Sequence, residues 1–420
     1  MAFENLFLRL VYFSFQETLR RGARGFFCLI NQDNVCFNAG IRIHSRAGRF
    51  LMDRTFMKTA MELAVKARGR TSPNPMVGAV VVKEDIIVGR GYHAKAGTPH
   101  AEIHALNEAG EAARGATIYV TLEPCCHYGR TGPCTDAIIN AGITRVVTAI
   151  SDPNPLVSGE GIRVLESAGI EVISGVMREE ALELNEIFFK YITTLRPFVV
   201  AKAAVSMDGK IATRSGKSKW ITSAAAREYG HQLRDWHDAI MVGIGTVLAD
   251  DPSLTTRLPD GRGRDPVRII LDSRASIPPQ ARVLTQQSGA NTIIAATSGA
   301  PPEKVEALRR SGAEVIIVND GPQVDLAELM RILGGRGLTS VLIEGGAMVH
   351  GSAFTAQIVD KVAWFIAPKI IGGQDAPGPV GGPGVENPSE AAELERVKVR
   401  RLGPDLLVEG YLKYSISTNL

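Results

Sequence analysis

The chain has 420 residues, of which 45% are hydrophobic and 22% are charged, and its formal net charge is +3. This composition is typical of a soluble globular protein with two or three domains. A net charge this close to zero does not indicate a basic surface for nucleic acid, so we expect a small-molecule substrate. The chain contains no run of about twenty apolar residues, the length needed to cross a membrane.

Residues 1–51 differ from the rest of the chain. They hold seven arginines, no lysine and three acidic residues, without a sustained helical or strand period. An arginine-rich, acid-poor leader is typical of organelle transit peptides, but serine is scarce here. The alternative, which we favour, is that translation begins at Met52, where an amphipathic helical pattern starts. In both cases we expect residues 1–51 to lie outside the fold.

Residues 52–195 alternate between helices and strands, as in a three-layer α/β domain. The expected helices are residues 54–67, a helix after His100, a helix that starts at Cys134, 159–168 and 178–191. The expected strands are residues 76–82, a strand that ends near Tyr92, 117–121, 145–150 and 169–174.

Residues 196–420 are expected to form a second α/β domain. Its strands are predicted at residues 198–205, 239–243, 267–271, 292–296, 315–318, 339–343 and 361–366. No G-x-G-x-x-G sequence follows the first strand, so the usual dinucleotide-binding fold is not indicated. Gly345-Gly346 and the glycines of residues 241–252 follow strands and open helices, where backbone N–H groups could hold a phosphate. Each could equally be a tight turn without a ligand.

His100, Cys125 and Cys134 have the residue types of a zinc site. Hydrolysis at zinc needs three protein ligands, an open position for water, and a carboxylate that moves protons without binding the metal. Glu102, two residues after His100 at a helix start, can be that carboxylate. H-x-E followed by P-C and a second cysteine is the pattern of zinc deaminases. A closed structural zinc site is the alternative, and it would need a fourth protein ligand.

The nine-residue interval from Cys125 to Cys134 is unlike that of nucleoside and nucleic-acid deaminases, in which the interval is three. Cys126 and His127 are poor alternative ligands, because a neighbour on a helical turn points about 100° away. We expect His100 and both ligand cysteines at helix N-termini, where the helix dipole favours thiolate. Three of the five cysteines lie within ten residues, which suits a metal and a reducing compartment better than disulfides. A cytoplasmic location follows, or an organelle if residues 1–51 are a targeting leader.

Asn74 lies in a Pro-Asn-Pro sequence before the first strand and could bind substrate. The same sequence also makes an ordinary turn. Sequence alone therefore leaves both roles open for this residue.

From Met52 onward the chain resembles the bifunctional deaminase/reductases of riboflavin biosynthesis. The resemblance rests on TSPNPMVGAVV, HAEIHAL, TLEPCCHYGRTGPC and DPNP in the first half, and on SMDGKIA, SKWIT, GTVLADDP, LDS, IEGGA and APKIIGG in the second. The interval between the two cysteines is the one this family uses. Gly132 stands where many members have proline, and residues 1–51 have no counterpart.

The resemblance implies a cytidine-deaminase fold for the first domain and a dihydrofolate-reductase fold for the second. It implies Zn2+-dependent deamination of 2,5-diamino-6-(5-phosphoribosylamino)pyrimidin-4(3H)-one. NADPH-dependent reduction of the ribosyl chain then gives 5-amino-6-(5-phosphoribitylamino)uracil.

The family's functional positions are matched in both halves. The zinc ligands are matched by His100, Cys125 and Cys134, and the proton carrier by Glu102. The NADPH-binding positions are matched by Ala204, Trp220, Thr246, Asp250, Ser273 and the run from Gly346. The substrate-binding positions are matched by Ser218, Arg234, Leu254, Arg257 and Glu344.

Arg234 and Arg257 suit the substrate's phosphate, because a guanidinium offers forked donors to phosphate oxygens. Solvated surface arginines are the alternative, and no residue identifies itself as the proton donor of the reduction. Two other functions stay open: a nucleotide or nucleic-acid deaminase with an accessory second domain, and a chain that has kept one activity. We expect a homo-oligomer.

Overall fold

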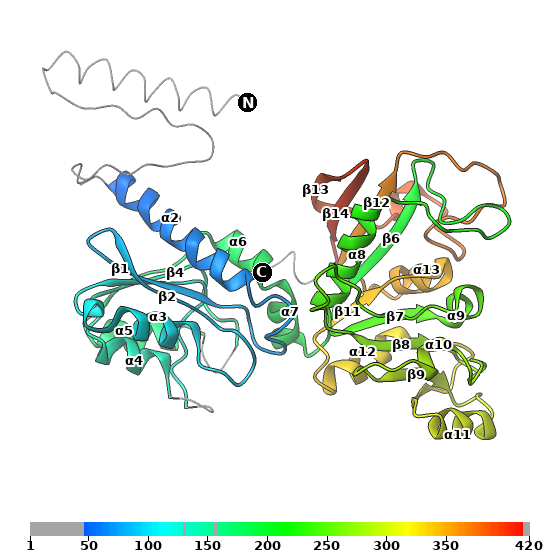
Figure 1. The fold of residues 1–420 in the computed structure, drawn as a ribbon, viewed down its shortest axis with the longest axis horizontal. Helices are drawn as coiled ribbons and strands as arrows, with labels where there is room; N and C mark the ends of the chain where they lie inside the picture. Colours follow the sequence, from blue (N-terminus) through cyan, green and yellow to red (C-terminus); the bar gives the residue numbers. More distant parts are fainter. Residues whose placement is uncertain (1–45, 129–131, 155–157, 415–420) are drawn as a thin grey trace, which may run out of the picture. The chain divides into compact units, whose positions relative to one another are not determined.

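The computed structural model describes residues 46–128, 132–154 and 158–414. Figure 1 shows two separate sheets, each covered by helices. One has five strands in the order β2-β1-β3-β4-β5, and the other has nine in the order β10-β9-β8-β7-β11-β6-β12-β14-β13. The α/β class expected from the sequence is confirmed. No helix in the described ranges has both the length and the apolar character needed to span a bilayer.

The first sheet is built from elements close to those expected. Its strands are β1 (Gly78–Lys83), β2 (Ile86–Tyr92), β3 (Thr117–Val120), β4 (Arg145–Thr148) and β5 (Glu171–Ile173). Its helices are α2 (Arg46–Val65), α3 (Ala101–Ala109), α4 (Cys134–Asn140), α5 (Glu160–Ser167), α6 (Arg178–Leu184) and α7 (Glu186–Thr194), with the short 3-10 helix η1 (Gly110–Ala113) after α3. β3 and β4 are parallel, whereas β1 runs antiparallel to β2 and β3.

The side chains of β1 show how this sheet separates two helical layers. Ala79 and Val81 pack in the cluster that holds α3, α4 and α5. Val80 and Val82 point the other way and pack with α2, α6 and α7. Figure 1 shows α2 on the side of the sheet opposite α3 to α5. Because helices cover both faces of the sheet, β1 is buried on both sides and its sequence is a nearly continuous apolar run.

The helix α2 begins at Arg46, earlier than the predicted start of the fold at Met52. Phe50 and Leu51 are exposed, and burial starts at Asp53, whose carboxylate receives two hydrogen bonds from the Arg145 guanidinium at 2.9 and 2.8 Å. Residues 46–51 of the expected leader are therefore part of α2, and the expectation that residues 1–51 lie outside the fold stays a prediction. The rest of the expected leader, residues 1–45, lies outside the described residues.

The helix expected at residues 178–191 is two helices, α6 and α7, which separate at Asn185. Asn185 is buried, and its side chain accepts a hydrogen bond from Met76 N at 2.8 Å and donates one to Met76 O at 2.9 Å. The break places this amide against the backbone that leads into β1. A helical period cannot reveal such a partner, because Met76 is far away in the sequence.

The second sheet contains the expected strands and two more. They are β6 (Phe198–Ser206), β7 (Ala239–Gly243), β8 (Val267–Leu271), β9 (Thr292–Thr297), β10 (Glu314–Asn319), β11 (Ser340–Ile343), β12 (Lys361–Ala367), β13 (Leu394–Leu402) and β14 (Asp405–Leu412). Its helices are α8 (Ala224–Trp236), α9 (Ile244–Asp250), α10 (Arg282–Thr285), α11 (Pro302–Arg310), α12 (Leu326–Gly335) and α13 (Ala347–Thr355), with the 3-10 helix η2 (Pro388–Glu390). The strands from β10 to β12 are parallel, and β14 and β13 add an antiparallel hairpin.

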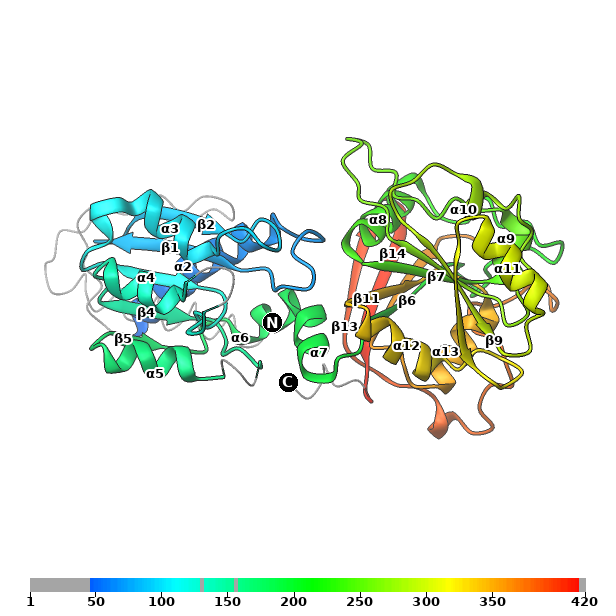
Figure 2. The same ribbon diagram turned by 90° about the horizontal axis from the view of Figure 1, so that it is seen from below.

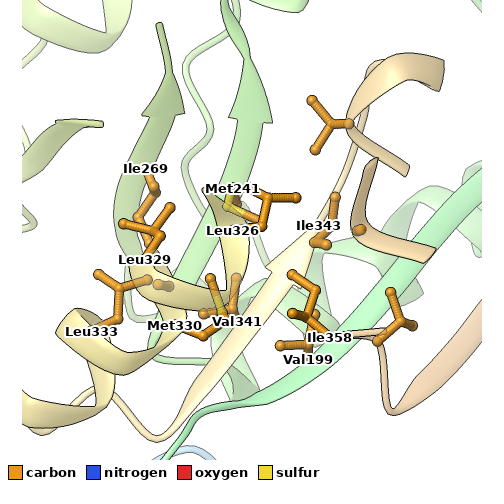
Figure 3. Packing of buried hydrophobic residues seen from close by; sticks show 14 of the residues in the cluster. Val199, Met241, Ile269, Leu326, Leu329, Met330, Leu333, Val341, Ile343 and Ile358 are labelled. Atoms are coloured by element: carbon orange, nitrogen blue, oxygen red, sulfur yellow. The ribbon is translucent and has the colours of Figure 1, made fainter. Parts of the chain in front are cut away.

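Helices cover both faces of the second sheet. Figure 2 shows α12 and α13 on one side and α9, α10 and α11 on the other, in agreement with two separate apolar clusters. In Figure 3, α12 turns Leu326, Leu329, Met330 and Leu333 toward the sheet, where Val341 lies beneath them. Each such side chain contributes about 1.5–3 kcal/mol when fully buried.

This topology determines where a site can form. β6, β7, β8 and β11 are parallel, so their carboxyl ends lie at one edge of the sheet. Ligands of open α/β sheets bind at that edge. β11 leads through Glu344-Gly345-Gly346 into α13, and β7 leads directly into α9. Ala204, Glu344 and Gly346 therefore lie at or directly after neighbouring strand ends, whereas Arg234 lies on α8 and Asp250 at the end of α9.

Candidate active sites

His100, Cys125 and Cys134 come together beside the first sheet. The Nδ1 atom of His100 lies 3.2 Å from the Cys134 sulfur and 3.5 Å from the Cys125 sulfur. His100 is the N-cap of α3, and Cys134 is the first residue of α4. Cys125 lies in the irregular segment between β3 and α4, so the expectation that it sits at a helix N-terminus is wrong.

The three ligand atoms fit a tetrahedral zinc ion. Zn–S and Zn–N distances of about 2.3 and 2.0–2.1 Å at tetrahedral angles separate nitrogen from sulfur by about 3.6 Å. The observed distances of 3.2 and 3.5 Å are close to this value. Among the described residues, no fourth histidine, cysteine or acid joins the group within 4.8 Å. Cys126 and His127 stay outside it, so the donor set suits an open site rather than a closed structural one.

Cys125 and Cys134 do not titrate alike. A hydrogen bond from the Cys134 thiol, opposed by burial, lowers the pKa of Cys125 to about 4. The same hydrogen bond, followed by burial, raises the pKa of Cys134. Cys125 therefore has thiolate character, the form that binds zinc.

Glu102 is the buried carboxyl group next to these ligands. It lies in the first turn of α3, as the sequence predicted. Burial, followed by the negative charge of Cys125, raises the pKa of Glu102 to about 7. A carboxyl group with this pKa can both take up and release a proton near neutral pH.

His93 is a neighbour of the metal ligands that the sequence analysis missed. Its ring stands edge-on to that of His100, with 5.4 Å between the ring centroids. Its Nδ1 donates to Pro99 O at 3.2 Å, which leaves Nε2 to accept from the Asn74 amide at 3.3 Å. Asn74 thus lies close to the ligand cluster. A single histidine after a strand gives no pattern that could have identified this role.

Glu123 joins two of the motifs around Cys125 and was also missed. Its carboxylate accepts backbone hydrogen bonds from Asp152 at 3.1 Å, Gly159 at 3.0 Å and Ile162 at 3.2 Å. The TLEPCC segment is thereby held against the segment that contains DPNP. Pro155 of that motif and residues 129–131 of the cysteine loop lie outside the described residues.

Glu344 and Arg234 form the centre of the candidate substrate site in the second half. The guanidinium donates from Nε and Nη2 to the two carboxylate oxygens at 2.6 and 2.8 Å, and from Nη1 to Thr255 O at 2.9 Å. Lys202 of β6, which the sequence analysis did not single out, lies 3.6 Å from Glu344. Burial alone would raise the pKa of Glu344, but Arg234 and Lys202 lower it to about 2. Because the Nε and Nη2 donors of Arg234 bind Glu344 and Nη1 binds Thr255 O, few N–H groups of this guanidinium are left for a phosphate.

Arg257 keeps an exposed guanidinium beside this group. Its Nη1 donates to Thr255 Oγ1 at 3.0 Å, and its backbone N–H donates to His231 Nδ1 at 3.3 Å. Leu254 packs its side chain in a core cluster, so only its backbone can meet a ligand. Ser218 is half-buried before α8, and no hydrogen bond among the described residues joins it to Arg234 or Glu344.

Several residues matched to NADPH-binding positions, among them Gly346, lie near the carboxyl ends of the strands. Gly346 is the N-cap of α13 with φ +83°, and a Cβ there would lie 3.4 Å from Val349 and 3.5 Å from Thr246. Thr246 of α9 and the glycine turn are therefore neighbours. A side chain at residue 346 would make only ordinary van der Waals contacts, so it is the positive φ that favours glycine there, and the phosphate site at this helix N-terminus stays a prediction.

The remaining NADPH positions are spread around this turn. Ala204 lies on β6, next to Phe365 of β12. The Trp220 side chain is exposed, and the Arg227 guanidinium lies over its ring, 4.5 Å from the ring centroid. The ammonium of the adjacent Lys219 lies 3.8 Å from the Asp250 carboxylate. Ser273 follows β8, and its carbonyl accepts from Thr297 N at 3.2 Å.

Two family models together match most of the chain. The cytidine and deoxycytidylate deaminase zinc-binding region matches residues 52–150, and the RibD C-terminal domain matches residues 197–408. Riboflavin biosynthesis protein RibD of Bacillus amyloliquefaciens is 47% identical over 84% of this chain and 95% of its own length. The protein of the same name from Aquifex aeolicus is 47% identical over 85% and 98%.

Solved structures agree over the full length of both halves. Acinetobacter baumannii RibD superposes with a TM-score of 0.78 at 36% identity, covering 87% of this chain and 99% of its own. A Thermotoga maritima diaminohydroxyphosphoribosylaminopyrimidine deaminase/5-amino-6-(5-phosphoribosylamino)uracil reductase superposes at 0.75 and 40% identity, with coverage of 87% and 99%. This chain belongs to the RibD family of riboflavin biosynthesis proteins.

Proposed function

We propose that this chain catalyses two consecutive steps of riboflavin biosynthesis. It hydrolyses the 2-amino group of 2,5-diamino-6-(5-phosphoribosylamino)pyrimidin-4(3H)-one and then reduces the ribosyl chain, which gives 5-amino-6-(5-phosphoribitylamino)uracil. Its cofactors are Zn2+ and NADPH, and its substrate is a small pyrimidine nucleotide. The observation that carries this function is the three-ligand cluster with a buried carboxyl group beside it, in a chain that matches RibD proteins over both halves.

In the deaminase site, His100, Cys125 and Cys134 hold the metal. Zinc, when bound, would lower the pKa of a water molecule so that this water can lose a proton and act as a nucleophile near neutral pH. Glu102 takes a proton from that water as it adds to the ring carbon, and returns the proton to the departing ammonia. Asn74 and His93 orient the pyrimidine, which is supported by their place beside His100.

In the reductase site, Ala204, Trp220, Thr246, Asp250, Ser273 and the turn at Gly346 bind the cofactor. NADPH supplies the hydride that reduces the sugar carbon. Ser218, Leu254, Arg257 and Glu344 bind the substrate, and Arg257 faces its phosphate. Arg234 holds the Glu344 carboxylate in place through both of its oxygens. Lys202 adds an ammonium group 3.6 Å from Glu344. It is a candidate for the proton donor of the reduction, a role for which the sequence identified no residue.

We assign the deaminase to residues 52–195 and the reductase to residues 196–420. This division is supported by two separate sheets and by the ranges that the two family models match. A homo-oligomer and a cytoplasmic location remain predictions.

The test is mass spectrometry of the product formed from the diaminopyrimidine phosphate. Without NADPH, the expected product has one amino group replaced by oxygen. With NADPH, it also carries two more hydrogens. Release of ammonia from cytidine nucleotides or single-stranded nucleic acid, with the diaminopyrimidine left intact, would instead support a nucleic-acid or nucleotide deaminase.

A further inference from the structure

Three sequence motifs of the second half meet in the structure. SMDGKIA spans residues 206–212, SKWIT residues 218–222 and APKIIGG residues 367–373. The first begins at the end of β6, the second precedes α8, and the third begins at the end of β12. Apart from Ser218 and Trp220, none of their residues has a role in the function described above.

Asp208 connects the first motif to the third. Its Oδ1 accepts hydrogen bonds from Ile371 N at 3.0 Å and from Ser206 Oγ at 2.6 Å. Its Oδ2 accepts from Gly372 N at 2.7 Å. The adjacent Met207 N donates to Lys369 O at 2.7 Å. A carboxylate that accepts two successive backbone N–H groups fixes both the position and the direction of that backbone.

Two lysines complete the connection. Lys210 donates from Nζ to Ala376 O at 2.8 Å, and Lys369 donates from Nζ to Trp220 O at 2.8 Å. We call Asp208, Lys210 and Lys369 the loop clamp. All three side chains bind backbone groups, so the clamp holds the path of the chain rather than any one side chain.

The clamped segment is a glycine-rich loop, residues 371–384, that has no helix or strand. Gly372 and Gly373 have φ of +68° and +86° at its start. Further along, Gly381 N donates to Ala347 O at 2.8 Å in the first turn of α13, directly after the Gly346 turn. The loop thus runs from Asp208 to the helix N-terminus that we assign to a cofactor phosphate.

Large apolar side chains stand exposed next to the clamped positions. The exposed fractions are 52% for Met207, 64% for Trp220, 61% for Met348 and 73% for Ile370. Ile370 directly precedes Ile371, whose backbone N–H Asp208 accepts, and Met207 directly precedes Asp208 itself. Exposed apolar side chains that gather in this way are typical of a binding surface. Ala204, an NADPH position, precedes this motif on β6.

We propose that Asp208 is a positioning residue for NADPH, which holds the start of the glycine-rich loop where the cofactor binds. This inference rests on the proposed reductase function. Without the carboxylate, two backbone N–H groups lose their acceptor, and the loop must be ordered each time the cofactor binds. The cost then appears in cofactor affinity, because Asp208 takes no part in hydride transfer.

The test compares Asp208→Ala, Asp208→Asn and Asp375→Asn in the full chain. Asp375 is an exposed acid on the same loop, for which the structure gives no hydrogen bond or ion pair, so its variant removes the same charge as Asp208→Asn. Five quantities are measured: the Kd of NADPH by fluorescence titration, the KM for NADPH and the kcat in reduction of the deaminated substrate, amide exchange of residues 369–376, and ammonia release. Circular dichroism and the kcat at saturating NADPH report on folding of the second domain, and ammonia release reports on the first.

Asp208→Ala is expected to raise the Kd and KM of NADPH by about tenfold and to speed amide exchange at Ile371 and Gly372, because a net hydrogen bond to a charged group is lost. The kcat at saturating NADPH and the rate of ammonia release are expected to stay within about twofold. Asp208→Asn keeps one acceptor oxygen, so its NADPH affinity and amide exchange are expected to lie between those of Asp208→Ala and the unaltered chain. Asp375→Asn is expected to match the unaltered chain in both.

Unchanged NADPH affinity in Asp208→Ala, with or without faster exchange, overturns the proposal. An equal loss of affinity in Asp375→Asn also overturns it, since net charge would then be the cause. If Asp208→Ala fails to fold, as shown by circular dichroism, Asp208→Asn is judged by the same affinity and exchange criteria. Failure of the proposed function shows separately, as an unaltered chain that binds NADPH but does not oxidise it.

Discussion

Glu102 and Glu344 are both buried carboxyl groups, but their surroundings shift their pKa values in opposite directions. Burial raises the pKa of Glu102 to about 7. Burial would raise that of Glu344 too, yet Arg234 and Lys202 lower it to about 2. Near neutral pH, Glu102 can therefore exchange a proton, whereas Glu344 is a fixed anion. The first suits general acid–base work, and the second suits binding and orientation.

Replacing Glu102 by glutamine is expected to keep zinc and abolish deamination. The amide cannot carry a proton between water and ammonia, and general acid–base groups are typically worth about 10²–10⁴ in rate. Metal analysis should still find about one zinc per chain, since the ligand cluster comprises only His100, Cys125 and Cys134. Cys126→Ser is the control, and it should keep both zinc and activity. Loss of zinc from the glutamine variant would make Glu102 a ligand and refute its assignment.

His231 is expected to make the chain less stable as the pH falls from about 6.5 to 4. Burial, and then the positive charge of Arg234, lowers its pKa from 6.5 to about 4. Between these values the unfolded state binds a proton that the folded state does not, so stability rises with pH there. The ring also accepts the Arg257 N–H at Nδ1, which requires the neutral form.

The measurement is the denaturant midpoint of the unaltered chain and of His231→Gln between pH 4 and 7. The glutamine does not titrate, so the unaltered chain should lose stability relative to the variant as the pH drops, while other groups titrate equally in both. Parallel curves for the two chains would contradict this prediction.

The residues of the two sites differ in how far sequence could identify them. The zinc ligands and Glu102 lie within 35 positions and carry a short motif, so local spacing was enough to bring them together in the prediction. Lys202, His231 and His93 gain their place only through contacts between distant segments, such as the approach of Lys202 on β6 to Glu344 after β11. Isolated lysines and histidines have no period or spacing that would mark them.

At the scale of elements, parallel strands were predicted well and the final hairpin was missed. The strands β7, β9 and β11 are buried along almost their whole length and are largely apolar runs between turns. β13 is an edge strand in which arginines and a lysine alternate with Val397 and Val399, both of which are exposed. Charged and apolar residues alternate along β13, but the side chains on both of its faces are exposed, so the pattern did not indicate a half-buried strand. The turn at Gly403-Pro404 was the one cue that could have revealed the hairpin.

Asn185→Ala is expected to lower the free energy of unfolding by about 1–3 kcal/mol, the cost of leaving buried backbone groups unpaired. Asn185 makes two hydrogen bonds to the Met76 backbone across the break between α6 and α7. Denaturant unfolding measures the change. Asn140→Ala, at an exposed position at the end of α4, is the matched control and should be nearly neutral. Equal effects at both positions would show that the break has no special role.

Each of the two sheets has its own candidate active site. The metal ligands belong to segments around the first sheet, and the residues matched to NADPH-binding positions belong to segments around the second. No residue assigned to one reaction is shared with the other. The two activities should therefore respond separately to changes at either site.

Removing zinc with a chelator is expected to stop ammonia release from the diaminopyrimidine and to spare reduction of a substrate supplied already deaminated. The reason is that every residue assigned to hydride transfer comes after Phe198. Ammonia and NADPH oxidation are followed in parallel, and circular dichroism checks that the metal-free chain is folded. Loss of both activities from a folded chain would contradict the separation.

Asp250→Ala is expected to have the opposite effect. It removes the carboxylate at the end of α9 that lies 3.8 Å from Lys219, next to Trp220. The KM for NADPH should rise several-fold, on the order of one lost charged contact, while ammonia release continues. Steady-state kinetics of both reactions on one preparation provide the comparison. A fall in ammonia release with normal zinc content would indicate coupling between the sites.

The place of β11 in the second sheet has a consequence for a chain that is still being synthesised. β11 lies between β7 and β6, and Phe198 pairs with Ser340. The first sheet has all its strands once residue 173 is made, whereas β6 has no neighbour on either side until β11 and β12 emerge. At about 5–20 residues per second, β6 waits on the order of ten seconds on the ribosome. During that time the N–H and C=O groups along both of its edges are unpaired and its apolar side chains are uncovered, so a chaperone would protect the chain most at this strand.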